Sequence, residues 1–363
     1  MPLHTSHAKT SLKIFNHPDR FIQGWYWAIR SSDLKIGAVK PLSLMGKDLA
    51  VYRGEDGVVI AIDAYCPHMG AHLAEGRVEG NSIRCFFHNW KFDQNGACTE
   101  MPCVDHLIPV KSSTYPTAEK YGMVWIWTGD LANQSVPFVP ELEDLECEIA
   151  FGDRFTKKCH PNVMMINAID ANHFNTVHNF PIEIEFAKRS LNQNAIAFNN
   201  TTRGGDDSLL VKLVRRFYKN EATYNMSYWF GSTGTVTLGP DFQHFYLMFA
   251  LRMLEGGQTE GQTILITRKR QGIWGWVLSQ IILWLTWLVG NYFAKGDTKI
   301  FQTIKFDLKT PTKADRSIVD FISHVETQTS IAWETWEVIE AESSPQQHSQ
   351  HPDRIPELVR ETI

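Results

Sequence analysis

Two short cysteine–histidine pairs stand close together in the first third of the chain. They read Cys66-Pro67-His68 and Cys85-Phe86-Phe87-His88, with sixteen residues between His68 and Cys85. Two thiolates and two imidazoles, delivered from two separate loops, suit a [2Fe–2S] cluster in which the cysteines hold one iron and the histidines hold the other. Neutral imidazole in place of thiolate removes negative charge from the cluster, which raises its reduction potential to roughly −150 to +300 mV.

A structural zinc site is the alternative for these four side chains, because two cysteines and two histidines also make tetrahedral zinc. Zinc fingers usually group cysteine with cysteine and histidine with histidine, whereas each pair here is mixed. Gly70, together with Pro67 between the first two ligands, also fits a tight loop that approaches a cluster. The pattern therefore favours the [2Fe–2S] cluster.

Length and composition describe an ordinary globular protein. The 363 residues are 43% hydrophobic and 21% charged, which is enough chain for two domains with their own cores. The net charge of −5 gives no reason to expect a nucleic-acid partner. No Gly-x-Gly-x-x-Gly or Walker-type loop occurs, so we do not expect a built-in nucleotide site.

We expect the six cysteines to be free or metal-binding thiols and not to form a disulfide framework. Two belong to the cluster pattern, and the beginning of the sequence shows no apolar signal segment. We therefore expect a cytoplasmic protein whose remaining cysteines stay reduced. These are Cys98, Cys103, Cys147 and Cys159.

The surroundings of the first motif predict a small antiparallel β domain over residues 20–135. Short strand-like runs separated by glycine precede and follow the ligand pairs, and a segment with two prolines, residues 131–140, resembles a linker. The runs Ala64–His68 and Cys85–Trp90 resemble the Rieske domain of Rieske non-haem iron oxygenases. Asn89 departs from that family, which more often has glycine there, but it is not a ligand position.

A second group of possible ligands lies between Asn167 and His178. On an ideal helix, Asp170 and His173 share a face, whereas His173 and His178 are five positions apart and about 140° around the helix. A π-bulge would bring the two histidines together. Two histidines and a carboxylate form the facial triad of non-haem Fe(II) enzymes. Alone, this spacing is more often that of surface histidines; beside the cluster motif it favours an iron site.

The family resemblance implies roles for these residues. The Asp-x2-His-x4-His spacing is similar to the iron-binding motif of the oxygenases, which implies His173 and His178 as iron ligands. In the family, the aspartate that matches Asp170 bridges to the cluster histidine of a neighbouring subunit, and Asn167 matches an asparagine near the iron. A local helix cap for Asp170 and a surface amide for Asn167 are the alternatives.

The third iron ligand is expected further along the chain. The segment Gly296-Asp297-Thr298-Lys299-Ile300-Phe301-Gln302 resembles the family's third-ligand segment, which implies Asp297. Asp307 is the alternative, although it lies in a more polar run. Asp315 and Asp320 are further candidates.

Strand-like segments between the ligands predict an antiparallel sheet. They are residues 208–214, 233–238, 242–251 and 263–267. The resemblance implies an α+β protein in which residues 136–340 form a helix-grip catalytic domain, a curved antiparallel sheet under a long helix. Residues 341–363 are expected to be a polar C-terminal tail.

Residues 271–294 contain no charged side chain and include four tryptophans. Their length suits a membrane span, but a single crossing would separate Asp297 from His173 and His178. Two interpretations remain open. The stretch is a buried helix lining a substrate cavity, or residues 273–293 lie in the plane of a membrane surface. Both predict a lipophilic substrate.

The resemblance implies an oxygenase that uses O₂ and electrons from a ferredoxin or an NAD(P)H-dependent reductase. It would hold a [2Fe–2S] cluster and a mononuclear Fe(II), and would assemble as a head-to-tail homotrimer. The chain looks more like ketosteroid hydroxylases and cholesterol desaturases than like aromatic dihydroxylating enzymes. Ring dihydroxylation of a small aromatic is the alternative activity. An electron-transfer protein whose second domain only binds a partner is the alternative class.

Overall fold

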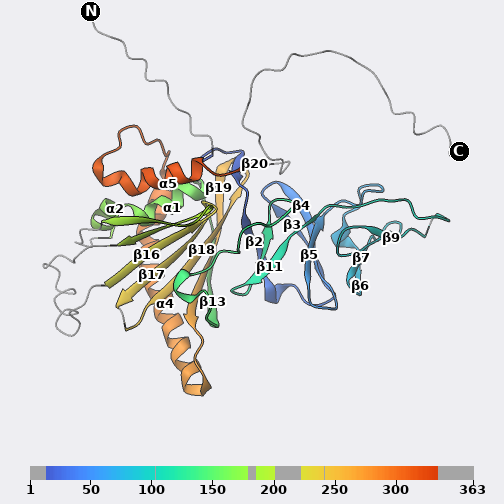
Figure 1. Ribbon diagram of the computed structural model, residues 1–363, viewed down its shortest axis with the longest axis horizontal. Helices are drawn as coiled ribbons and strands as arrows, with labels where there is room; N and C mark the ends of the chain where they lie inside the picture. The colour runs from blue at the N-terminus through green and yellow to red at the C-terminus, as the bar shows by residue number, and fades with distance from the viewer. Residues whose placement is uncertain (1–13, 103, 179–184, 201–221, 241, 334–363) are drawn as a thin grey trace, which may run out of the picture.

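The computed structural model describes residues 14–102, 104–178, 185–200, 222–240 and 242–333. Two lobes lie side by side: an N-terminal lobe of small sheets and a C-terminal lobe built on one large sheet (Figure 1). The expected α+β class is confirmed, with a small antiparallel β domain followed by a large antiparallel sheet and a long helix. The predicted strand 208–214 and the tail 341–363 lie outside the described residues.

The N-terminal lobe holds three antiparallel sheets. The first has the order β10-β5-β4-β3: Thr114–Tyr115, Val59–Asp63, Lys47–Arg53 and Val39–Leu44. The second has the order β6-β7-β8-β9: Arg77–Glu79, Ser82–Arg84, Lys91–Phe92 and Cys98–Glu100. The third has the order β11-β12-β2: Thr117–Lys120, Met123–Trp127 and Trp25–Arg30.

The third sheet joins the lobes, and this explains its unusually aromatic sequence. Every residue of β12 is buried, although side chains alternate between the two faces of a strand. Val124 and Ile126 belong to the core of the N-terminal lobe, whereas Trp125 and Trp127 pack into the core of the C-terminal lobe. Because both faces meet a core, the alternation of polar and apolar residues is lost.

The C-terminal lobe is organised on a seven-stranded antiparallel sheet with the order β13-β19-β18-β17-β16-β15-β14. Its strands are Cys147–Lys157, Gln258–Arg268, Phe245–Leu254, Thr233–Pro240, Ala222–Trp229, Ala195–Asn200 and Phe186–Asn192. The helices are α1 (Pro161–Ile166), α2 (Ala171–Val177), α4 (Gly272–Thr303) and α5 (Arg316–Glu326). The predicted strands at 233–238 and 263–267 fall within β17 and β19, whereas the one at 242–251 begins three residues before β18.

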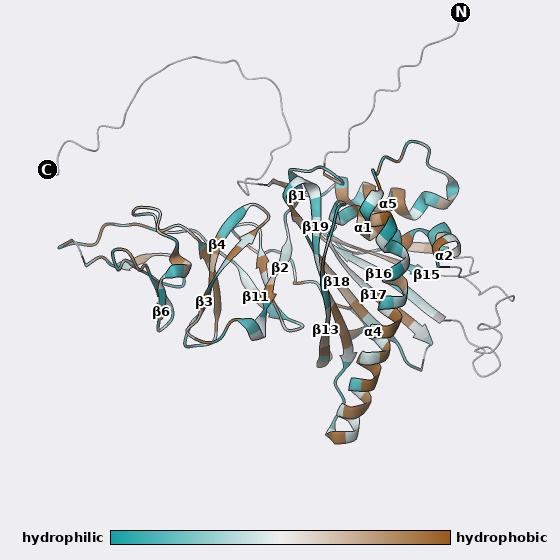
Figure 2. Ribbon diagram, turned by 180° about the vertical axis from the view of Figure 1, so that it is seen from behind, coloured by the Kyte–Doolittle hydropathy of each residue, from teal (hydrophilic) through white to brown (hydrophobic). Residues whose placement is uncertain are grey.

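Two further features position the C-terminal lobe. Helix α4 packs on β13, β18 and β19, crosses one face of the sheet and extends past its edge at the N-terminal end (Figures 1 and 2). Strand β1 (Arg20–Ile22) pairs with β20 (Ser330–Ala332) at the end of this lobe, and Phe15 is buried in the same core. The first described residues therefore pack with the C-terminal lobe, ahead of the N-terminal sheets.

Candidate metal centres

The two cysteine–histidine pairs lie in neighbouring loops of the N-terminal lobe. The first follows β5 and the second connects β7 to β8. Backbone hydrogen bonds close both loops: the amide of Cys66 donates to the carbonyl of Ala71 at 2.9 Å, and the amide of Cys85 donates to the carbonyl of Trp90 at 2.9 Å. In each loop the cysteine is buried and the histidine is half-buried, so the thiols lie inside and the imidazoles lie nearer to solvent.

One donor atom of the four side chains has no protein partner among the described residues. The ring of His68 stacks on Trp90 at 4.4 Å and lies 4.5 Å from the ring of His88. His68 Nδ1 is buried without a hydrogen bond among the described residues. Burial raises the pKa of the Cys66 thiol to about 11, and the neighbouring Cys85 acts in the same direction. An orphaned ring nitrogen beside two buried thiols is the donor set that an iron–sulfur cluster would satisfy.

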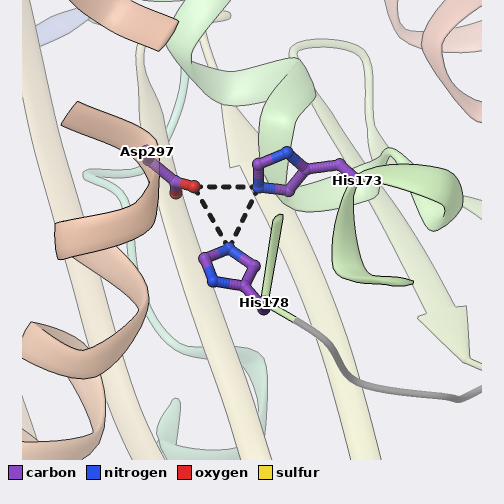
Figure 3. A group of neighbouring side chains, drawn as sticks. All are labelled: His173, His178 and Asp297. Carbon is purple, nitrogen blue, oxygen red and sulfur yellow. Dashed lines mark hydrogen bonds and ion pairs between the residues drawn. The ribbon is translucent and has the colours of Figure 1, made fainter. Parts of the chain in front are cut away.

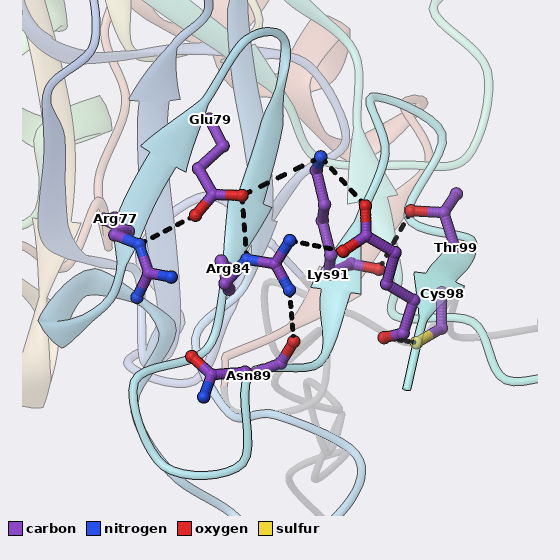
Figure 4. A network of polar contacts seen from close by, with 8 residues as sticks. Arg77, Glu79, Arg84, Asn89, Lys91, Cys98 and Thr99 are labelled. Carbon is purple, nitrogen blue, oxygen red and sulfur yellow. Dashed lines mark hydrogen bonds and ion pairs between the residues drawn. The ribbon is translucent and has the colours of Figure 1, made fainter. Parts of the chain in front are cut away.

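A buried arginine braces the second loop. Arg84 donates to Glu79 Oε2 at 2.8 Å, to the carbonyl of Asn89 at 2.7 Å and to Glu100 (Figure 4). The ion pairs raise the pKa of Arg84, with the hydrogen bond to Glu100 as the largest cause. Asn89 itself has φ of +59°, a left-handed conformation that asparagine tolerates better than most residues and that glycine adopts freely. The backbone conformation at this position therefore accepts asparagine and would also accept glycine.

The second pair of histidines lies where α2 begins and ends. Asp170 is the N-cap of α2, and its Oδ1 accepts hydrogen bonds from the amides of Asn172 at 3.0 Å and His173 at 3.1 Å. The predicted π-bulge is wrong: α2 ends at Val177, and His178 follows as its C-cap with φ of −97° and ψ of −3°. The helix therefore ends before His178, and no extra residue is inserted into the helix between the two histidines.

Three donor atoms from two distant segments meet at this point (Figure 3). His173 Nε2 lies 3.0 Å from His178 Nε2, and Asp297 Oδ1 lies 2.8 Å from the first and 3.1 Å from the second. Asp297 Oδ1 is buried but accepts no well-aligned hydrogen bond among the described residues. Burial lowers the pKa of His178, which favours the neutral imidazole that binds metals.

The spacing of these atoms fits a facial triad. Metal–ligand bonds of about 2.1 Å at right angles hold neighbouring ligand atoms about 3.0 Å apart. Two imidazole nitrogens and one carboxylate oxygen are also the donor set of non-haem Fe(II). The residues therefore fit a mononuclear iron.

Asp297 belongs to α4, and a glycine beside it allows the helix to approach. A Cβ atom on Gly296 would lie 3.0 Å from both His178 Cε1 and Val177 Cγ1. The other candidate aspartates lie elsewhere. Asp307 pairs with Lys309 at 3.2 Å, Asp315 closes a turn with Thr312, and Asp320 lies 3.4 Å from Lys188.

The structure also places the two remaining site candidates. Asn167 lies in the short 3-10 helix η4 (Asn167–Ile169), with its Nδ2 3.1 Å from His173 Nε2. Asp170 orients His173 through the backbone, as the local-cap interpretation expects. No hydrogen bond to Asp170 Oδ2 is found among the described residues.

A cavity of about 290 Å³ opens beside the triad. His173, His178 and Asp297 form part of its wall, and the sheet supplies most of the remainder through apolar side chains. These include Met226, Val236, Leu238, Leu247, Phe249 and Leu265, while α4 adds Trp287, Gly290 and Phe293. Lys157 also lines the cavity, with its Nζ 3.2 Å from Thr298 Oγ1.

Comparison with known proteins identifies the N-terminal domain. The model of the Rieske [2Fe-2S] domain matches residues 24–116. Cholesterol 7-desaturase nvd of Bombyx mori is 35% identical over 182 residues, which cover 47% of this chain and 39% of that protein. A probable 3-ketosteroid-9-alpha-monooxygenase oxygenase component of Rhodococcus rhodochrous is 33% identical over 168 residues, which cover 44% and 42%. The chain therefore contains a Rieske [2Fe-2S] domain, and over this part it is similar to oxygenases that carry the same domain.

Solved structures agree with the fold of the whole chain. The NdmA QL mutant of Pseudomonas putida CBB5 with caffeine superposes with a TM-score of 0.60 at 15% identity, covering 89% of this chain and 98% of that one. Dicamba monooxygenase with non-heme iron and dicamba gives 0.57 at 18% identity, covering 84% and 95%. The aligned sequence spans less than half the length of either curated relative named above.

The family match settles the first centre in favour of a Rieske [2Fe–2S] cluster over zinc. Sequence reasoning missed Gly296 and Lys157. Gly296 directly precedes the third-ligand candidate, and a glycine within a long helix signals a close approach. No sequence pattern marked Lys157 as a cavity residue. Its position at the cavity depends on the register in which β13 pairs with β19.

Proposed function

We propose that this protein is a Rieske oxygenase, which uses O₂ and electrons from a separate reductase to hydroxylate or desaturate a lipophilic, steroid- or terpenoid-like substrate. The observation that carries the proposal is the meeting of His173 Nε2, His178 Nε2 and Asp297 Oδ1 within 3.1 Å of one another at the wall of an apolar cavity. A redox cluster in one lobe and an iron-type triad in the other are the two parts that such chemistry needs.

The residues of the chain divide the work between the lobes. When bound, the cluster supplies electrons one at a time and Fe(II) supplies a site for O₂. Cys66 and Cys85 would hold the cluster from the inside, and His68 and His88 would hold it from the solvent side. In the other lobe, the apolar cavity wall excludes water from the site, and Asp170 fixes the start of the helix that carries His173.

The lining of the cavity supports a lipophilic substrate. Aliphatic and aromatic side chains dominate the wall, and such pockets take up ligands mainly by apolar contact. Relatives named as cholesterol 7-desaturase and as 4beta-methylsterol monooxygenase of Methylococcus capsulatus point in the same direction. Supplying a surrogate ferredoxin and reductase with sterols, terpenoids and aromatic acids, followed by product analysis, tests the proposal. Product from a sterol or terpenoid supports it, and product from aromatic acids alone contradicts it.

Oxidation of a small aromatic acid is the second candidate. Lys157 is the observation that favours it, because an ammonium group at the cavity wall would pair with a substrate carboxylate. A 3-chlorobenzoate-3,4-dioxygenase oxygenase subunit of Comamonas testosteroni is 34% identical over 161 residues. Replacing Lys157 by methionine would abolish binding of an aromatic acid and leave sterol binding intact.

The arrangement of the two sites supports a homotrimer. Strand β7, beside the cluster loops, and helix α2, beside the triad, lie at opposite ends of the molecule (Figure 1). Electrons would then pass between subunits, as a head-to-tail ring permits. The exposed tip beside the cluster loops, formed by Met69, Phe86 and Phe87, offers an apolar contact surface for a neighbouring subunit or the reductase.

Subunit mixing tests this arrangement. Cys85→Ser removes a cluster ligand, Asp297→Ala removes an iron ligand, and each variant alone would be inactive. When the two are co-expressed, electrons can pass from an intact cluster in one subunit to an intact iron in the next, so activity returns. Inactive mixed oligomers would contradict electron transfer between subunits.

A further inference from the structure

The outward face of helix α4 is apolar along most of its length. Its exposed side chains follow a helical spacing of three and four residues: Trp274, Leu278, Ile281, Trp284, Leu285, Leu288 and Tyr292. We call this set the α4 stripe. Trp274 is 82% exposed and Trp284 is 58% exposed, so the stripe is not covered by the fold. Figure 2 shows the hydrophobic colour continuing along α4 beyond the edge of the sheet.

The polarity of this helix is reversed relative to a helix on the surface of a water-soluble protein. Within the apolar part of the helix, the small polar side chains Ser279 and Thr286 are fully buried on the side that packs on the sheet. The hydroxyl of Thr286 donates to the carbonyl of Ile282 at 2.7 Å. Asp297 is the only acidic residue of α4, and it points inward to the triad. The outward face therefore combines apolar side chains with no negative charge.

Cations flank the α4 stripe at both ends. Arg268, Lys269 and Arg270 precede the helix, although Lys269 pairs with Glu146 at 3.0 Å. Lys295 and Lys299 follow the stripe on the same outward face, and no ion pair joins either to a carboxylate among the described residues. Tryptophan and tyrosine beside lysine and arginine are the side chains that favour the boundary between lipid headgroups and acyl chains.

We propose that the α4 stripe docks in the plane of an anionic phospholipid bilayer. The apolar side chains would enter the acyl boundary, and Arg268, Lys295 and Lys299 would contact headgroup phosphates. A crossing of the membrane by α4 is excluded by its packing, although its length and composition would allow one. The inward face of the helix lies on β13, β18 and β19 and delivers Asp297 to the triad.

Charge also argues against a second copy of the chain as the occupant. Pairing two α4 stripes in either direction would place the cations at each end of one helix beside cations of the other. No outward side chain of α4 itself is acidic, although Glu148 of β13 accepts a hydrogen bond from Gln280 at 3.1 Å beside the stripe. An anionic surface complements both ends at once.

The docked orientation gives the cavity a lipid-facing entrance. Trp287 lines the cavity and is 40% exposed, and the next residue, Leu288, belongs to the α4 stripe. A lipophilic molecule could therefore pass from the bilayer into the cavity without crossing water. This consequence rests on the proposed function, whereas the docking itself does not.

Flotation of the full-length holoprotein tests the docking. Vesicles contain phosphatidylcholine with about one third phosphatidylglycerol, or phosphatidylcholine alone. The wild type is expected to float with the anionic vesicles, and the variant Trp284→Glu/Leu288→Glu is expected to remain at the bottom. The matched control Leu131→Glu, at a position 82% exposed in the segment between the lobes, is expected to float like the wild type. Lys295→Gln/Lys299→Gln should weaken binding to anionic vesicles about 30-fold.

Far-UV circular dichroism, together with the cluster absorbance spectrum, shows that both lobes of each variant remain folded. Wild type that does not float, or a Trp284→Glu/Leu288→Glu variant that floats equally well, overturns the proposal. Light scattering measures the oligomeric state of the wild type and of the Trp284→Glu/Leu288→Glu variant. An oligomer that dissociates in the variant would show that a second copy of the chain covers the α4 stripe, which would overturn the proposal. Because flotation needs no turnover, a protein that floats yet forms no product would overturn the proposed activity and leave the docking standing.

Discussion

The two metal centres differ in how far apart their ligands lie along the chain. The cluster ligands fall within 23 residues, from Cys66 to His88, on loops of neighbouring hairpins. The triad joins His173 and His178 to Asp297, which lies more than 100 residues further along and on a helix packed across the large sheet. The first site depends on local turns and a buried arginine. The second depends on the correct packing of a whole domain.

The largest effect is expected at the long-range site. Asp297→Ala removes one of three converging donors, so we expect product formation to fall by roughly 100-fold or more. Iron content should fall from about three to about two per chain, while the cluster spectrum persists. The control is Asp307→Ala, whose carboxylate pairs with Lys309 away from the triad. Loss of the cluster spectrum with Asp297→Ala would show that the two centres are not independent.

At the cluster site, a substitution of Arg84 is expected to lower the stability of the N-terminal lobe. Arg84 is 8% exposed and bonds two carboxylates and the Asn89 carbonyl, so Arg84→Gln removes the charge-assisted hydrogen bonds of a buried guanidinium. We expect the N-terminal lobe to lose about 2–3 kcal/mol of unfolding free energy, limited by the partial exposure of the carboxylates. Urea unfolding monitored by cluster absorbance measures this loss. Arg77→Gln removes an exposed ion pair in the same sheet and should cost less than about 1 kcal/mol.

Mild acid should weaken the C-terminal lobe in particular. Burial lowers the pKa of His160 to about 3. The unfolded chain binds a proton near pH 6.5, so this histidine's contribution is complete above that pH and is lost as the pH falls. Between pH 7 and pH 5 the loss is about 2 kcal/mol.

The variant His160→Asn tests this expectation, because asparagine also caps a helix and does not titrate in this range. Urea midpoints at pH 7 and pH 5 should show a smaller fall for the variant than for the wild type. Equal falls would show that His160 does not control the acid response.

The smallest effect concerns the approach of α4 to α2. Gly296→Ala places a Cβ atom 3.0 Å from the His178 ring, which must shift, so we expect iron affinity to fall about tenfold. Gly290→Ala is the matched control, because its Cβ would meet only the flexible end of Leu247 at 2.9 Å. Iron titration monitored by equilibrium dialysis distinguishes the two variants. Unchanged affinity for Gly296→Ala would show that the ring tolerates the closer helix.

The contrast between the sites also explains what the sequence could predict. Cys66 to His88 could be interpreted locally, because ligand types and spacing alone define a cluster site. The proximity of Asp297 to the histidines followed only from a family resemblance, since no local pattern links residues more than 100 positions apart. The π-bulge was wrong because helix ends are set by capping, and here Asp170 and the C-cap at His178 fix a shorter helix.

The apolar stretch shows a different limit. Sequence left a buried helix and a membrane-surface helix as alternatives, and the structure gives α4 both a packed face and an exposed face. Hydrophobicity on all sides of a helix does not reveal which side meets the protein. That distinction required the position of Ser279 and Thr286 against the sheet.

The central claim is that one chain holds a redox cluster and a separate iron. Iron analysis of protein reconstituted anaerobically, combined with the absorbance of the cluster, tests it most directly. We predict about three irons per chain, two accounted for by the cluster spectrum and one removed by Asp297→Ala. Two irons per chain with a complete cluster spectrum would contradict the claim and favour an electron-transfer protein.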